Sequence, residues 1–181
     1  MFLCRTQKVR YTAEKPLTLV SRYDKLILLG GLWTARFLMI EGWIFVKIVV
    51  SACLLGRNCK YNGSNNYDPK VAEFVRGADV IAVCPEECLG MPRIPMEIVN
   101  GVLVNRDGES VDGIVRGQVA AILERLRGED IECCVLKSRS PTCGVRQIYD
   151  GTFSGKLVDG MGVLAQALRD AGYRCVDAED L

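Results

Sequence analysis

From about residue 46 onward, short apolar runs rich in β-branched residues alternate with longer segments that repeat apolar residues at helical spacing. Such alternation is typical of βαβ units, which build a mostly parallel sheet. The first three runs are mainly apolar, so we expect these strands to be buried on both faces. The predicted strands cover residues 47–52, 79–83, 131–136 and 173–176.

Three further segments show the pattern of helices. Residues 68–76 open with an Asp-Pro pair, which favours the first turn of a helix. Residues 111–127 place apolar side chains on one helical face. Residues 161–170 are followed by Gly172, and glycine is common just after the end of a helix. The pattern therefore predicts a single Rossmann-like α/β domain with a mostly parallel sheet over residues 46–181.

Residues 1–45 follow a different pattern, with a polar, basic start and an apolar run that begins near residue 26. Glycines and charged residues interrupt this run, so it lacks the roughly 18 continuous apolar residues of a membrane span. It also lacks the cleavage pattern of a signal peptide. We interpret residues 1–45 as an N-terminal extension, either a loosely attached arm or a segment upstream of a true start at Val46. We expect no membrane partner.

The composition limits the function in three ways. With 181 residues, 49% of them hydrophobic, the chain suits one domain with a continuous core. Lysine and arginine (23) nearly balance aspartate and glutamate (22), which disfavours nucleic acid as a partner. Nine cysteines, an odd number in a chain of ordinary core size, favour a reducing compartment and hence a cytoplasmic protein.

The chain contains no histidine, so a metal must be held by thiolates, carboxylates or substrate atoms. Cys53, Cys84 and Cys143 each follow a predicted strand, where open α/β sheets bind their ligands. We interpret these three thiols as a metal site at the carboxyl edge of the sheet. The alternative, that they are small buried hydrophobic residues, better suits the cysteines inside strands, which are Cys133, Cys134 and Cys175.

Two other readings of the cysteines remain open. Cys59 or Cys88 could supply a fourth thiolate, and a four-thiolate zinc or iron-sulfur site would be closed and would serve a structural or sensor module. A thiol-disulfide enzyme is the third reading. It is disfavoured because no CxxC pair occurs and the adjacent Cys133 and Cys134 lie within a strand.

The loops also contain a series of short motifs in a fixed order. They are SACLLG with a following KYNG, CPE with GMPRIPMEI, KSRSPTCG with QIYDGTFSG, and GMGV before the last helix. From about residue 46 to residue 181, this series resembles a bacterial family long classed as a domain of unknown function and now associated with thiouracil desulfidases.

The resemblance implies a [4Fe-4S] cluster held by Cys53, Cys84 and Cys143, with one iron left without a protein ligand. It also implies a small thiolated substrate such as 2-thiouracil. The soft sulfur of this substrate would bind the open iron, and water would then hydrolyse its carbon–sulfur bond. Cys59 and Cys88 depart from many relatives, which puts the open iron in question.

Two loop residues are candidates for catalysis. With no histidine available, a carboxylate is the natural base for a water molecule, and Glu86 lies two residues beyond Cys84. Ser140 precedes Cys143 by three residues and could hydrogen-bond a substrate or cluster sulfur. Each has a plainer interpretation, Glu86 as a carboxylate that caps backbone NH groups and Ser140 as a turn serine before a proline.

Overall fold

The computed structural model describes residues 9–10 and 46–181. Its centre is a five-stranded sheet with the order β1-β3-β2-β6-β9. The β2, β3, β6 and β9 strands run parallel, whereas β1 pairs antiparallel with β3. The strands are β1 (Val9–Arg10), β2 (Lys47–Ser51), β3 (Asp79–Val83), β6 (Ile131–Leu136) and β9 (Cys175–Asp177).

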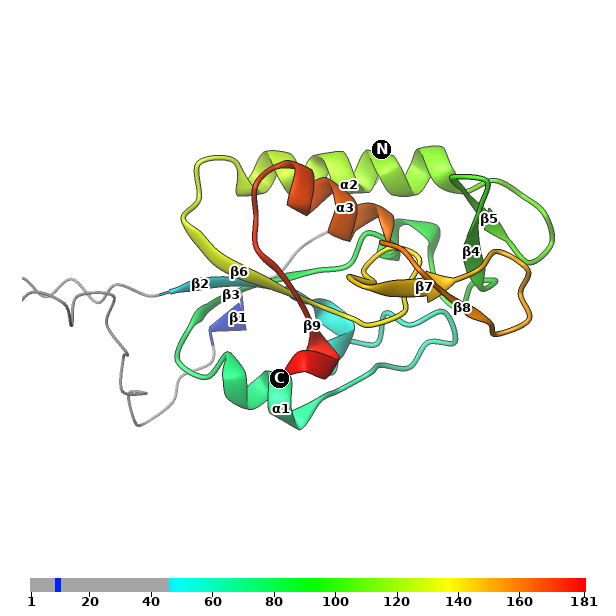
Figure 1. Ribbon diagram of the computed structural model, residues 1–181. Helices are drawn as coiled ribbons and strands as arrows, with labels where there is room; N and C mark the ends of the chain where they lie inside the picture. The colour runs from blue at the N-terminus through cyan, green and yellow to red at the C-terminus, as the bar shows by residue number, and fades with distance from the viewer. Residues whose placement is uncertain (1–8, 11–45) are drawn as a thin grey trace, which may run out of the picture.

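Helices cover both faces of this sheet, as Figure 1 shows. The long helix α2 (Asp112–Leu126) and α3 (Val163–Asp170) lie over one face, and α1 (Pro69–Phe74) lies over the other. Asp68 caps α1 by accepting hydrogen bonds from the backbone NH groups of the first turn. The predicted α/β fold with a mostly parallel sheet is therefore confirmed.

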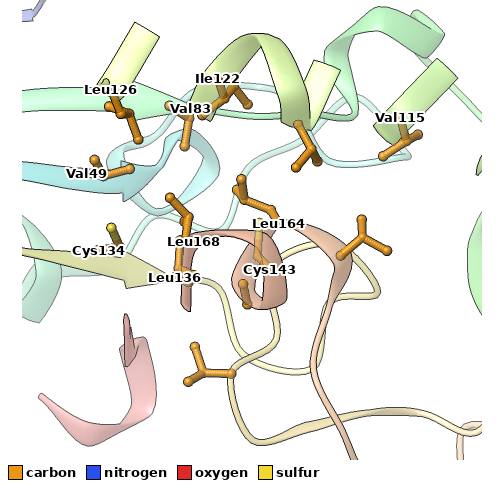
Figure 2. Close-up of a cluster of buried hydrophobic side chains, with 14 of the residues drawn as sticks. Val49, Val83, Val115, Ile122, Leu126, Cys134, Leu136, Cys143, Leu164 and Leu168 are labelled. Atoms are coloured by element: carbon orange, nitrogen blue, oxygen red, sulfur yellow. The ribbon is translucent and has the colours of Figure 1, made fainter. Parts of the chain in front are cut away.

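Successive side chains of the central strand, β2, point alternately to the two helical layers. Val49 packs with α2 and α3 in the cluster shown in Figure 2, while Ile48 and Val50 pack with α1 on the opposite side. Because successive side chains of a strand point to opposite faces, a strand buried on both sides must be apolar throughout. This explains the continuous apolar run of β2.

The predicted elements differ from the observed ones mainly at their ends. The first strand stops at Ser51, because Ala52–Leu55 forms a 3-10 turn, η1, whose end Gly56 adopts a φ of 87°. Two further 3-10 turns are η2 (Glu87–Leu89) and η3 (Ala178–Asp180).

Sequence reasoning missed the hairpin of β4 (Met96–Val99) and β5 (Val102–Asn105). Its signal was present, since Asn100 and Gly101 both have positive φ and an Asn-Gly pair is typical of a tight hairpin turn. A second hairpin joins β7 (Gln147–Tyr149) and β8 (Leu157–Asp159). Both hairpins stand at one end of the sheet.

The interpretation of residues 1–45 as an extension lies outside the described residues, apart from Val9 and Arg10. The backbone of these two residues pairs with Val80 and Asp79 at the edge of the sheet. Within the described ranges, no helix is both long enough and apolar enough to cross a bilayer.

Candidate functional site

A cavity of about 470 Å³ opens at the carboxyl edge of the parallel strands. Cys53 follows β2, Cys84 follows β3 and Cys143 lies in the loop after β6, and all three line this cavity. The strands β3 and β6 flank β2 on either side in parallel pairing, so their carboxyl ends meet at one edge. Glu86 and Ser140 line the same cavity, so the structure brings together all five residues singled out in the sequence.

Local backbone geometry holds the loops of two of the thiols, Cys53 and Cys143, in place. The carbonyl of Cys53 accepts hydrogen bonds from the backbone NH groups of Gly56 and Asn66, which closes the turn after β2. Cys143 is only 6% exposed and lies at the edge of the α2 and α3 core. Gly162 packs so closely on this loop that an added Cβ would lie 2.4 Å from the carbonyl carbon of Thr142.

The thiols differ in how readily they ionise. Hydrogen bonding by the Cys59 thiol lowers the pKa of Cys53 to about 7, and Asn66 and Lys137 act in the same direction. Burial raises the pKa of Cys143 to about 12, and nearby Cys53 and Cys84 add to this effect. Since the thiolate is the ligand form of cysteine, Cys53 is better prepared than Cys143 to bind a metal at neutral pH.

Of the two extra cysteines, only Cys59 belongs to the cavity. Cys59 is 2% exposed and lines the cavity beside Cys53 and Cys84. Hydrogen bonds with these two thiols raise the pKa of Cys59. Cys88 lies outside the lining, and its thiol donates to the carbonyl of Pro85 at 3.1 Å.

The carboxylate of Glu86 is held from two sides. Its Oε1 accepts a hydrogen bond of 2.6 Å from the Thr142 hydroxyl and a longer one, 3.5 Å, from Ser140. Its Oε2 lies 2.5 Å from Nη2 of Arg93, whose side chain is 6% exposed. These bonds fix the carboxylate at the cavity wall and stabilise its charge.

The Ser140 hydroxyl has a structural part in its loop. It accepts hydrogen bonds of 3.2 Å from the backbone NH groups of Thr142 and Cys143, and it pairs with the Thr142 hydroxyl at 2.9 Å. Its backbone contacts are those of a turn serine, as the plainer interpretation expects. Its hydroxyl also contacts Glu86, so the two interpretations are compatible.

Sequence reasoning missed Thr142 and Arg93. Thr142 is fully buried and its hydroxyl also lies 3.6 Å from the sulfur of Cys143, so it joins the carboxylate to a thiol. Both residues stand inside motifs that were recognised, SPTCG and GMPRIP. Membership of these motifs was the sequence feature that could have marked both residues as candidates for the site.

The cavity is also lined by aromatic and charged side chains, among them Tyr149, Phe153, Arg106 and Glu97. Arg106 lies over the ring of Phe153 at 5.9 Å, and the buried Glu97 accepts a hydrogen bond from the Phe153 backbone at 3.0 Å. Flat apolar surfaces with a few polar groups suit a small planar molecule.

The thiols do not form a ready site for a single ion. Among the described residues, no three side chains of cysteine, histidine, aspartate or glutamate converge as ligands of one metal ion. In a closed zinc site the thiolates would stand about 3.8 Å apart, as follows from Zn–S bonds of about 2.3 Å. In an iron-sulfur cluster each thiolate binds a different iron, so its thiols need not converge on one point.

Comparison with known proteins shows the family of the chain. The model of the 2-thiouracil desulfurase family matches residues 48–180. The chain belongs to this family. The matched region contains the described sheet except β1 and the first residue of β2, the helices α1 to α3 and every residue of the candidate site.

The chain is also similar to two known proteins. The uncharacterized protein YbbK of Bacillus subtilis (strain 168) is 36% identical over 146 residues, which cover 74% of this chain and 97% of YbbK. The solved structure of the [4Fe-4S]-dependent thiouracil desulfidase TudS (DUF523Vcz) is 30% identical. It covers 75% of this chain and 93% of TudS with a TM-score of 0.69.

Proposed function

We propose that this protein is a [4Fe-4S]-dependent desulfidase that hydrolyses a small thiocarbonyl compound such as 2-thiouracil. The observation that supports it most directly is the meeting of three strand-end thiols and a held carboxylate around one cavity. Membership of the desulfurase family and the likeness to TudS support the same reaction class.

In this proposal Cys53, Cys84 and Cys143 hold the cluster, and their chemistry fits it. All three are thiols, the ligands that iron-sulfur clusters use, and Cys53 has a pKa near neutrality. When bound, such a cluster supplies a soft Lewis-acidic iron that accepts the thiocarbonyl sulfur. The aromatic side chains of Tyr149 and Phe153, which line the cavity, would orient the ring of the substrate.

Glu86 is the proposed base. Its carboxylate takes a proton from a water molecule whose oxygen bonds to the thiocarbonyl carbon, and the carbon–sulfur bond then breaks. Sulfur leaves as hydrosulfide and the carbon becomes a carbonyl, so no electrons are gained or lost. Thr142 and Arg93 fix the two oxygens of Glu86, so the carboxylate is oriented before the substrate arrives.

The test is anaerobic reconstitution with iron and sulfide, followed by incubation with 2-thiouracil. We expect about four irons and four sulfides per chain, as a [4Fe-4S] cluster requires, with release of sulfide and uracil in equal amounts. The matched control is the same protein without the cluster, which should release neither. A fully loaded cluster with no sulfide release from any thiopyrimidine would overturn the proposal.

The closed four-thiolate module remains the second candidate, because Cys59 lies against both Cys53 and Cys84. A closed site would keep its metal without turnover. Metal analysis of the Cys59→Ser variant separates the two functions. Loss of the metal would favour the closed module, and retention would favour the open cluster.

A further inference from the structure

Arg93 has a buried guanidinium that is only partly satisfied. Its side chain is 6% exposed, and its Nη2 donates both to Glu86 and, at 2.9 Å, to the carbonyl of Cys59. Its Nε and Nη1 atoms are buried and have no hydrogen-bond partner among the described residues. A buried donor without an acceptor costs about 1–3 kcal/mol, so native sites normally supply one.

Arg93 shares its surroundings with a sulfur atom that could act as an acceptor. The Cys59 carbonyl that accepts from Nη2 also lies 4.0 Å from the sulfur of Cys84, so the guanidinium and a proposed ligand flank the same oxygen. Arg93 and Cys84 both line the cavity. Glu86 is the carboxylate that already pairs with Arg93, and it engages Nη2 rather than the two free nitrogens.

We propose that the free donors of Arg93 bind sulfur atoms of the loaded site, either cluster sulfide or the Cys84 thiolate. This inference rests on the proposed function, since it assigns a positioning residue for the same cluster. An iron-sulfur cluster with its thiolates is anionic and rich in sulfur acceptors, and NH groups directed at those sulfurs are a recognised means of tuning it. One guanidinium thus links the base, the Cys59 loop and the cluster.

The substitution that removes the free donors is Arg93→Lys. Lysine keeps a positive charge for Glu86 but lacks the planar set of donors. The loop itself remains anchored, because the backbone NH of Arg93 donates to the Tyr61 carbonyl at 2.8 Å whatever the side chain. We therefore expect the cluster-free variant to unfold at the same temperature as the wild type.

The matched control is Arg57→Lys. Arg57 pairs with Glu87 at 2.8 Å and joins the same two loops, yet neither residue lines the cavity. In the reconstituted proteins, Arg93→Lys should lower the reduction potential of the cluster, because hydrogen bonds to sulfur stabilise the reduced form. It should also speed iron release to bathophenanthroline by about tenfold or more, the usual effect of a charged hydrogen bond. Arg57→Lys should change neither quantity.

A measurement on the wild type keeps the test independent of how the variant folds. Protein labelled with ¹⁵N only at arginine is reconstituted, reduced with dithionite and studied by pulsed electron paramagnetic resonance. A ¹⁵N coupling that disappears in Arg93→Lys supports the contact. Arg106 and Arg139 also line the cavity, so if Arg93→Lys does not fold, a coupling that persists in Arg106→Lys and in Arg139→Lys supports it.

The outcomes separate the inference from the proposed function. A loaded cluster without ¹⁵N coupling, whose potential and iron release are unchanged in Arg93→Lys, overturns the role of Arg93. That result leaves the proposed desulfidase function standing, since none of these three measurements requires turnover of a substrate. A wild-type protein that takes up no cluster overturns both.

Discussion

The hydroxyl of Thr142 donates a 2.6 Å hydrogen bond to Glu86 although 56 residues separate the two in the chain. Thr142 adjoins Cys143, and its hydroxyl also lies 3.6 Å from that sulfur. The proposed base and a proposed cluster ligand are thus fixed by the same side chain. Any displacement of the loop after β6 would move both groups together.

Thr142→Val tests this link because valine has a similar shape but no hydroxyl. Glu86 Oε1 would keep only the longer contact with Ser140. We expect turnover of 2-thiouracil to fall roughly tenfold to a hundredfold, as for the loss of a hydrogen bond to a charged group. Cluster absorbance should remain, because the backbone NH of Cys143 still donates to the Ser140 hydroxyl and holds the loop. Thr142→Ser keeps the hydroxyl and should restore most of the rate, and equal losses in both variants would contradict the link.

Glu86→Gln tests the base. The amide keeps the size of the side chain but cannot take up a proton, so turnover should fall by about a hundredfold or more while the cluster spectrum remains. The control is Glu87→Gln, one residue along the chain, whose carboxylate pairs with Arg57 away from the cavity. It should retain nearly full activity. Comparable rates for the two variants would remove Glu86 from the reaction.

Much of the fold and of the site could be predicted because the signals are local. Apolar runs define the parallel strands, and residues that follow those runs must gather at one edge. The contacts of Arg93 and Thr142 with Glu86 could not be predicted, because they join loops whose paths depend on tertiary packing. The β4–β5 hairpin was predictable from its Asn-Gly turn, and that signal was overlooked.

Gly162→Ala tests how the Cys143 loop is positioned. The new Cβ would meet the Thr142 carbonyl carbon at 2.4 Å and the Cys143 nitrogen at 2.7 Å. Since the φ of Gly162 is −70°, the cost is steric and not conformational. We expect a loss of about 1–3 kcal/mol in the unfolding free energy of the cluster-free protein, measured in urea, and reduced cluster uptake.

The control for this substitution is Gly117→Ala in α2. An added Cβ there meets nothing within 4 Å, and alanine favours a helix interior. This variant should gain about 0.5–1 kcal/mol. If Gly162→Ala proved equally stabilising, the close packing of α3 on the loop would be wrong.

The lowered pKa of Cys53 predicts a pH dependence in the cluster-free protein. Hydrogen bonding by Cys59 stabilises the thiolate, so the thiolate fraction of Cys53 should rise as the pH passes about 7, below the ordinary value of 9.0. Alkylation by iodoacetamide follows that fraction. Peptide mapping by mass spectrometry should show Cys53 modified at pH 7.5, while Cys143, with its pKa raised by burial to about 12, stays unmodified. The reverse order would contradict the assignment.

Single cysteine substitutions decide how the cluster is held. Cys53→Ser, Cys84→Ser and Cys143→Ser should each abolish cluster retention and sulfide release, because a site with three ligands cannot spare one. Cys88→Ser is the control, since Cys88 lies outside the cavity lining, and it should behave as the wild type.

Cys59→Ser is the most informative variant, because Cys59 contacts two of the proposed ligands. We expect it to keep both cluster and activity. If Cys59→Ser were as damaging as Cys143→Ser, a fourth thiolate would close the cluster and the open-iron reaction would fail.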